Sequence, residues 1–323
     1  QGKYLVPHES DNRVPNPYTG IKSNFSPARN LNSVLIDSSS NGFGKVVSTT
    51  RPIDEDDDNW VIVYRQNAGV GTTHGQLASA CTDDIGAMED WDIYTNINKN
   101  GDPPWGGGGF GTCEGGTCAQ ARYPSAAASP DFPYAIWNEY TGETTFGSTY
   151  GGRAYYSYDS FEWDGDSWGT PVDIDLLWET AAKDQWSGSA QFSFDEDLDM
   201  GVLNAVYDDW TRENSFLFHT EIIEQGLAIF ATEQIAIDAT LLGDPGYTTP
   251  PALTMNDSGQ GVMGVIGLFP GVDPAYGTCT SDVTCNHVPI FKLTADHGAT
   301  WYGPSDGSNE FYFVPDAVFD DIF

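Results

Sequence analysis

The chain has 323 residues, and 39% of them are hydrophobic, which is enough for a sizeable core and too much for a disordered segment. It carries 13 Lys and Arg residues against 47 Asp and Glu residues, and the net charge of −34 repels nucleic-acid phosphates and anionic lipid headgroups. No window of about 18 apolar residues occurs, so we expect no nucleic-acid partner and no insertion into a membrane.

The composition is typical of an all-β protein. The 36 Gly and 19 Pro residues mark frequent turns, and the segments between them are rich in aromatic and β-branched side chains, which fit a pleated sheet. Residues 1–30 show little periodicity and are predicted to form an extended N-terminal arm. Residues 31–323 contain no evident linker, so they are predicted to form a single domain.

Beyond the arm, strand-like segments recur four times in the same order. Each unit has a strand of small residues, an apolar strand, a strand that ends in a hydroxyl or thiol residue and an acid, and a fourth strand. In chain order, the predicted strands are residues 33–36, 60–64, 80–83 and 91–94; residues 125–128, 134–137, 156–159 and 168–172; residues 189–193, 202–207, 219–221 and 227–230; and residues 252–255, 262–268 and 293–296 with a run after Trp301. This repeat predicts a β-propeller of four-stranded antiparallel blades, of which at least four are recognisable.

The last unit contains the most specific motif of the chain, Thr294-Ala-Asp-His-Gly-Ala-Thr-Trp301. A tight turn needs a side chain that bonds to the turn's own backbone, a Gly that accepts a positive φ and an aromatic ring that covers the turn. Asp296, Gly298 and Trp301 supply these three parts. The segment resembles the Asp-box of sialidase-like β-propellers, with Thr294 in place of the commoner Ser.

This resemblance implies a fold and a structural role for the motif. In the family the Asp-box lies at the blade periphery, so we expect Asp296 to hold the turn and not to act in catalysis. Degenerate copies fit residues 81–91 and 157–163. The resemblance also implies about six or seven blades, so either some blades escape the pattern or the chain is a fragment. Residues 311–323 have strand character without an obvious partner, which indicates a last blade that is cut short.

The resemblance also raises the possibility of a sialidase-like active site. Such a site uses three arginines to clamp a substrate carboxylate, together with a Tyr nucleophile, a Glu and an Asp. Arg65, Arg153 and Arg212 are the candidates for the clamp. Arg65 follows Tyr64 as in the family's Tyr/Phe-Arg-Ile-Pro signature, but the next residues depart from it. Convergence of the three would favour a glycoside hydrolase or polysaccharide lyase, and ordinary pairing with acids is the alternative.

Acidic clusters occur at residues 54–58 and at a predicted strand-to-strand turn that contains Asp195, Asp197, Asp199 and Gly201. Alternating carboxylates at a sharp turn can supply the hard oxygens that calcium prefers. The spacing is not that of an EF-hand, because the Gly comes one place late and no Glu follows at the last ligand position. The cluster therefore predicts either a calcium site or a solvated acidic turn.

Cysteine spacing indicates an oxidising compartment. Cys113 with Cys118 and Cys279 with Cys285 are predicted to form two local disulfides, and Cys81 is expected to be a buried free thiol. The first residues lack the basic and apolar regions of a signal peptide, so an extracellular or cell-surface protein would have lost that peptide by processing. No haem-attachment box and no phosphate-binding loop occurs, so we expect neither haem nor a nucleotide.

Ten Trp residues are present, and five lie beside Gly, Asp or Ser in predicted turns: Trp105, Trp163, Trp168, Trp186 and Trp301. Exposed aromatic rings can stack on sugars, and the alternative is packing between blades. The sequence as a whole favours a secreted or cell-surface propeller that recognises glycans or surface proteins. A glycosidase or lyase of the same fold is the first alternative, and a fragment of a larger adhesin or extracellular fibre is the second.

Overall fold

The computed structural model describes residues 35–37, 50–65, 76–85, 90–98, 111–113, 116–118, 120–140, 152–163, 167–174, 184–209, 214–222, 226–231, 234–238, 251–267, 288–305, 310–314 and 318. By its internal contacts the chain divides into two units, Gln1–Leu35 and Ile36–Phe323. The predicted arm, residues 1–30, lies outside the described residues and stays a prediction. All elements below belong to the second unit, and no helix among its described residues is long and apolar enough to cross a membrane.

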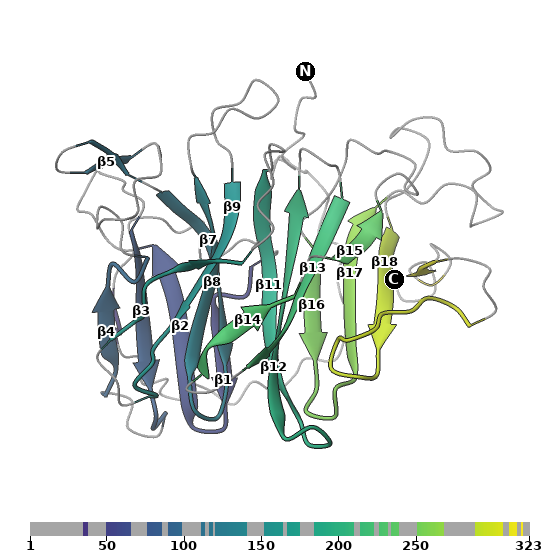
Figure 1. Ribbon diagram of the computed structural model, residues 1–323, viewed down its shortest axis with the longest axis horizontal. Coiled ribbons are helices and arrows are strands. Elements are labelled where there is room, and N and C mark those ends of the chain that lie inside the picture. Colours follow the sequence, from purple (N-terminus) through teal and green to yellow (C-terminus); the bar gives the residue numbers. More distant parts are fainter. Residues whose placement is uncertain are drawn as a thin grey trace, which may run out of the picture. The chain divides into compact units, whose positions relative to one another are not determined.

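Four antiparallel sheets of consecutive strands follow one another along the second unit (Figure 1). The first contains β1 (Ile53–Asp56), β2 (Asn59–Arg65), β3 (Leu77–Thr82) and β4 (Asp92–Thr95). The second contains β7 (Gln120–Ala128), β8 (Pro133–Tyr140), β9 (Gly152–Tyr158) and β10 (Val172–Asp173). The third contains β11 (Gln185–Asp195), β12 (Met200–Asp209), β13 (Asn214–Ile222) and β14 (Ala228–Phe230), with β15 (Gln234–Asp238) also paired to β13. The fourth contains β16 (Ala252–Met255), β17 (Gly261–Gly267), β18 (Val288–Thr294) and β19 (Tyr312–Phe313), and β5 (Gly111–Cys113) with β6 (Gly116–Cys118) forms a separate hairpin.

Each of the four sheets is a meander in which neighbours in sequence are neighbours in space, and the first strands of successive sheets pack against one another. This is the construction of β-propeller blades. The prediction of an all-β fold with four-stranded antiparallel blades is therefore confirmed.

The second strand of the first blade is apolar on both faces because both faces are covered. In β2, Val61 and Val63 belong to a core shared with the second sheet, whereas Ile62 and Tyr64 pack on the opposite side with Ile36. Successive side chains of a strand point to opposite faces, so a strand between two layers is apolar throughout. This explains why the apolar segments were the clearest signal in the sequence.

Serine hydroxyls connect the first strands of neighbouring blades. Ser125 of β7 donates a hydrogen bond of 2.7 Å to the carbonyl of Gly188 in β11. Ser189 of β11 accepts a hydrogen bond of 2.6 Å from the backbone N–H of Leu253 in β16. Because these strands lack backbone pairing with each other, the two buried hydroxyls satisfy backbone groups that would otherwise lose hydrogen bonds. The small residues predicted for first strands thus allow close approach of the blades.

The predicted first strand of the first blade, residues 33–36, is wrong. The described residues of that segment form no strand, and β1 takes this position beside β2 instead. Ile36 packs against the core side chains Tyr64, Ala78 and Ala80, and the hydroxyl of Tyr64 donates to Asp37. Of the two described residues of the segment, Ile36 takes part in this packing and Leu35 is exposed.

Strand β1 was not predicted from the sequence because three of its four residues are acidic. Asp54 is 2% exposed, and its carboxylate accepts a 2.9 Å hydrogen bond from the N–H of Ala128 and forms a 2.6 Å ion pair with Arg51. Burial raises the pKa of Asp54, while Arg51 opposes this rise. Alternate residues Ile53 and Glu55 face solvent, so the strand has a half-buried pattern despite its charge.

The interpretation of residues 311–323 as a blade without a partner is also wrong at its start. Tyr312 and Phe313 form β19 and pair with Phe291 and Ile290 of β18. Phe311 is fully buried in the core of the third and fourth sheets. These residues therefore complete the fourth blade. Their partner strand, β18, could not be recognised from the sequence because a long connection separates the two strands.

Candidate functional site

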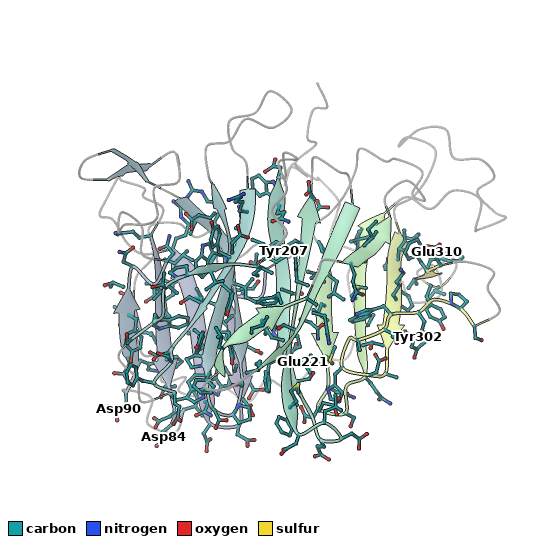
Figure 2. All side chains as sticks on the ribbon, in the orientation of Figure 1. Asp84, Asp90, Tyr207, Glu221, Tyr302 and Glu310 are labelled. Carbon is teal, nitrogen blue, oxygen red and sulfur yellow. The ribbon has the colours of Figure 1, made fainter. Side chains whose placement is uncertain are left out.

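Strands β2, β8 and β12 all end on one side of their sheets, which we call the upper end, as it appears in Figure 1. The turns that join β1 to β2, β7 to β8 and β11 to β12 form the lower end. Figure 2 shows Asp84 and Asp90 at the lower end of the first sheet and Tyr207 in the upper half of the third. Several buried polar side chains lie at the upper ends of β8 and β12, namely Asn138, Glu139, Asp208 and Asp209.

Two neighbouring first strands bulge at this upper end. The pairing of β7 with β8 shifts between Arg122 and Ser125, and the pairing of β11 with β12 shifts between Ser187 and Ala190. Tyr123 lies in the first bulge with φ 48°, a left-handed conformation that is costly for an aromatic residue. Bulges re-aim side chains and are frequent beside functional sites.

The bulges bring two aromatic rings together. The ring centroids of Tyr123 and Trp186 are 5.4 Å apart at an interplanar angle of 44°, and both side chains are half-buried. Each ring comes from a different blade. We name this pair the inner-strand site, together with Arg122 beside Tyr123, Asp184 beside Trp186, and Glu139, whose pKa the charge of Arg122 lowers.

Glu139 is the most perturbed charged group of this site. Its side chain is 1% exposed, and its Oε2 atom accepts hydrogen bonds from Trp137 Nε1 at 2.7 Å and Asn98 Nδ2 at 3.5 Å. Oε1 has no hydrogen-bond partner among the described residues. Burial raises the pKa of Glu139 to about 8, although the bonds from Trp137 and Asn98 and the charge of Arg122 oppose this rise. The carboxyl is therefore mostly protonated at neutral pH.

Further charged groups lie on or beside neighbouring strands of the second and third blades. Asp184 accepts a 2.9 Å hydrogen bond from the N–H of Gly152, and burial raises the pKa of its carboxyl. On β9 and β10, Arg153 and Asp173 form an ion pair of 3.6 Å with both side chains partly exposed. The arrangement places stacking surfaces beside hydrogen-bonding groups of both signs, which suits recognition of a polar ligand with flat apolar faces.

The predicted arginine clamp has the following positions. Arg65 ends β2 and is 4% exposed, and Arg153 lies on β9 with Asp173 as its ion-pair partner. Arg212 lies outside the described residues. A clamp needs guanidinium groups that face an open substrate site. Because Arg212 is not described, convergence of the three arginines stays a prediction.

The Asp-box-like segment forms the turn that follows β18. Both carboxylate oxygens of Asp296 accept hydrogen bonds from Thr300, at 2.9 Å from its N–H and 2.6 Å from its hydroxyl, and Thr294 donates another at 2.8 Å. Gly298 has φ 86°, and Trp301 Nε1 donates to its carbonyl at 3.0 Å. Burial acts to raise the pKa of Asp296, but these hydrogen bonds outweigh it and the pKa lies below its usual value. The geometry gives Asp296 a turn-holding role.

Asp296→Ala is expected to lower the free energy of unfolding by about 1–2 kcal/mol, because several turn hydrogen bonds are lost at once. Urea unfolding at pH 7 would measure the change. Asp257→Ala removes an exposed acid from the turn between β16 and β17 and should change stability by less than about 0.5 kcal/mol. Equal effects of the two substitutions would show that Asp296 is an ordinary surface acid.

The predicted calcium turn joins β11 to β12. One carboxylate oxygen of Asp195 accepts the backbone N–H groups of Asp197 at 3.0 Å and Leu198 at 3.1 Å, which caps the turn. In the part of the chain that the structure describes, no three His, Cys, Asp or Glu side chains are grouped as a metal site, so Asp195, Asp197 and Asp199 are not brought together. Calcium binding stays a prediction.

Other predicted residues divide between the core and the undescribed segments. Cys81 is a buried free thiol, as expected. The side chains of Cys113, Cys118, Cys279 and Cys285 lie outside the described residues, so the two disulfides stay predictions.

Among the five Trp residues, Trp163 and Trp168 pack in the core of the first two blades, and Trp301 packs against the core of the last two. Trp186 alone of the described four joins the inner-strand site, and Trp105 is not described.

Sequence analysis missed Tyr123 and Glu139. A weak signal for Glu139 was present, since Asn138 and Glu139 are polar residues at the end of an otherwise apolar strand. Tyr123 had no comparable signal, because its position depends on the bulge of β7 and on Trp186 from another blade.

Comparison with known proteins gives similarity only at the level of solved structures. No family model matches the chain, and no curated protein matches it. A Trypanosoma rangeli sialidase in complex with the inhibitor DANA has 13% identity and a TM-score of 0.44, with 79% of this chain and 38% of that chain covered. The NanB sialidase of Streptococcus pneumoniae has 11% identity and a TM-score of 0.38 over 71% of this chain and 27% of that one. The exo-β-1,3-galactanase 1,3Gal43A of Clostridium thermocellum has 10% identity and a TM-score of 0.43 over 81% and 47%.

This chain therefore spans less than half the length of each of these three structures. Similarity at this level assigns no activity to the chain. Its function has to be inferred from the inner-strand site.

Proposed function

We propose that the protein is an extracellular or cell-surface recognition module that binds glycans at the inner-strand site. The observation that carries the proposal is the ring pair of Tyr123 and Trp186, which two bulged first strands from different blades present at the upper end. A backbone held at φ 48° for Tyr123 costs free energy, and such strain persists where surrounding structure and function require it.

The chemistry of the site favours a neutral glycan. Sugar rings have apolar C–H faces that stack on aromatic side chains, and their hydroxyl groups can bond to the charged groups beside the pair. Arg122 donates to a backbone carbonyl at 2.9 Å, and Asp184 adds a carboxylate beside Trp186. The net charge of −34 works against sulfated or sialylated chains.

Trp186→Ala and Tyr123→Asn are expected to weaken retention on neutral polysaccharides at least about tenfold, which corresponds to about 1.4 kcal/mol of binding free energy. Asn suits the second position because it tolerates a positive φ, so the ring is lost without new backbone strain. Affinity electrophoresis with neutral, sulfated and sialylated polysaccharides, with calcium and with EDTA, would measure the effect. Phe161→Ala, which removes a 64% exposed ring in the connection between β9 and β10, is the matched control.

Unchanged retention in both site variants would contradict the proposal. Absence of binding to every glycan would instead favour the alternative of a cell-surface protein as partner. Loss of binding in EDTA would support the calcium prediction for the Asp195–Asp199 turn.

A glycosidase function is the second candidate, and one observation favours it. A carboxyl group that is protonated near neutral pH, as Glu139 is, can act as a general acid. The side chain is 1% exposed, however, whereas a general acid has to come within hydrogen-bond distance of the leaving group. Release of sugar product that Glu139→Gln abolishes would establish the enzyme and overturn the binding module.

A further inference from the structure

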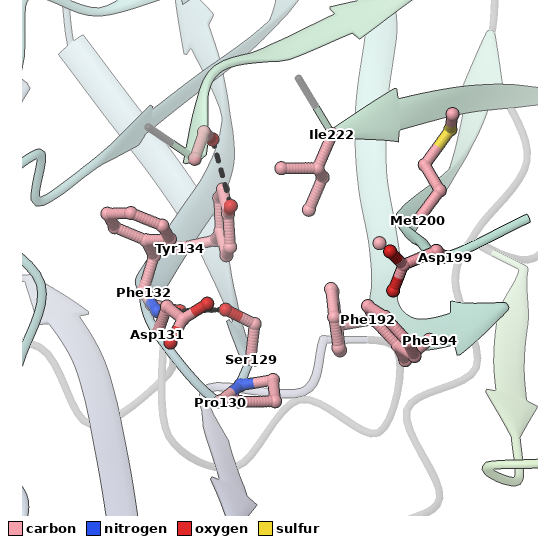
Figure 3. Close-up of a pocket in the computed structure, with 12 residues that line it drawn as sticks. Ser129, Pro130, Asp131, Phe132, Tyr134, Phe192, Phe194, Asp199, Met200 and Ile222 are labelled. Carbon is pink, nitrogen blue, oxygen red and sulfur yellow. Dashed lines mark hydrogen bonds between the residues drawn. The ribbon is translucent and has the colours of Figure 1, made fainter. Parts of the chain in front are cut away.

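A cavity of about 470 Å³ lies at the lower end of the second and third blades, on the side opposite the inner-strand site (Figure 3). One wall comes from the turn between β7 and β8, which includes Phe132, and from the start of β8 with Tyr134. The other wall comes from β11 and β12, with Phe192 of β11. The volume is within the range of sites for small molecules.

The apolar wall of the cavity is held in place by close contacts. A Cβ atom at Gly226 would lie 2.6 Å from the ring of Phe132, and this Gly has φ 77°, so the ring packs directly on its backbone. The hydroxyl of Tyr134 donates a 2.8 Å hydrogen bond to the carbonyl of Gly226. The hydroxyl of Tyr134 is therefore engaged and its ring is fully buried, so the aromatic surface open to the cavity comes from Phe132 and Phe192. A wall fixed in this way needs little ordering when a ligand enters.

The charged residues that line the cavity are both acidic. Asp131 lies on the β7–β8 wall and Asp199 on the β11–β12 wall, as Figure 3 shows, and both side chains are exposed. Among the residues that the structure describes, no Lys or Arg lines this cavity. A cation at its mouth would be attracted by both carboxylates and by the aromatic faces, and the acidic chain adds a field of the same sign.

We propose that this cavity binds a small organic ammonium ion whose aromatic body fills the apolar interior and whose cationic group lies near Asp131 and Asp199. Burial of the aromatic body supplies the hydrophobic part of the affinity, and the two carboxylates supply selectivity for positive charge. An anion of the same shape is repelled, and a neutral molecule gains only the apolar contact. This site is separate from glycan binding and does not depend on it.

Titration with the phenethylammonium ion, followed by ligand-observed NMR, tests the proposal. We expect the ammonium ion to bind at least about tenfold more tightly than 2-phenylethanol, and 3-phenylpropionate to show no binding. The preference should shrink at high salt, because exposed charges are screened. Equal affinity for the three compounds, or binding of none, would overturn the proposal.

Two substitutions locate the site. Asp199→Asn preserves the backbone, because Asp199 has φ 52° and Asn tolerates that conformation, and Asp131→Asn removes the charge of the other wall. We expect each to weaken ammonium binding about threefold to tenfold, and the double variant to bind the ammonium ion no better than the alcohol. Glu196→Gln, in the same turn but outside the cavity lining, should bind as the unaltered protein does. Ammonium affinity that is unchanged in a folded double variant would refute the site.

Discussion

We expect the protein to lose stability between pH 5 and pH 9, and Glu139→Gln to remove much of that loss. The folded chain keeps the proton of Glu139 up to about pH 8, whereas the unfolded chain releases it near pH 4.5. The folded state is therefore favoured most below the unfolded pKa, and the free energy of unfolding falls as the pH rises through the folded pKa. Since one pKa unit corresponds to about 1.4 kcal/mol, the full loss is on the order of 5 kcal/mol.

The charged groups around Glu139 do not cancel this effect. Arg122 is close enough to lower the pKa of Glu139. Arg153 lies opposite Glu139 in the register of β8 and β9, and its guanidinium group forms an ion pair with Asp173. Gln can keep the hydrogen bonds from Trp137 and Asn98, because it has the same shape and an acceptor oxygen. The variant should therefore fold, and should exceed the unaltered protein in stability at pH 9.

Urea unfolding at pH 5, 7 and 9 would measure the difference. Glu310→Gln changes an exposed acid and should leave the pH profile as it is. The pKa values of Asp54 and Asp184 are also raised, so in all variants the free energy of unfolding still falls somewhat as the pH rises. Parallel pH profiles for the unaltered protein and E139Q would show that Glu139 does not hold its proton in the folded chain.

Gly188→Ala should destabilise the protein by about 3 kcal/mol and weaken the inner-strand site. A Cβ atom at Gly188 would lie 2.1 Å from the carbonyl oxygen of Pro251 and 3.0 Å from that of Val206. Both are backbone atoms, so they can move only if β11 separates from β16 or β12, and overpacking of this kind costs about 1–3 kcal/mol or more. The same bulge of β11 positions Trp186.

Thermal and urea unfolding would measure the loss, together with polysaccharide retention. Gly169→Ala is the matched control, because the nearest atom to its Cβ would be the carbonyl oxygen of Tyr158 at 3.5 Å, an ordinary contact. The control should change stability by less than about 0.5 kcal/mol. A Gly188→Ala variant as stable as the control would mean that the blades are not in contact at this bulge.

Local patterns in the sequence predicted most of the blade strands. Val61 and Val63 alternate with Ile62 and Tyr64 in a strand that is covered on both faces, and this continuous apolar run is visible without any tertiary information. The turn around Asp296 is equally local, since its hydrogen bonds join residues no more than four positions apart. Patterns of this kind are readable because strand pairing within a meander links neighbours in the chain.

The strand predictions were wrong where contacts between residues far apart in the chain outweigh the local hydrophobic pattern. The acidic strand β1 is stable because Arg51 and the N–H of Ala128 satisfy the buried carboxylate of Asp54. The fourth strand of the last blade, β19, lies after a long connection, so its pairing with β18 could not be seen in the residues around it.

Local sequence patterns are sufficient to predict the fold class, the succession of four blades and the turn that Asp296 holds, because each depends on side-chain alternation or on hydrogen bonds between near neighbours. The members of the inner-strand site become evident only from the packing of the folded chain. Tyr123 meets Trp186 through two bulges in different blades, and the pKa of Glu139 rises because core layers from several strands exclude water. Such proximity and desolvation come from packing between blades, and no local segment encodes them.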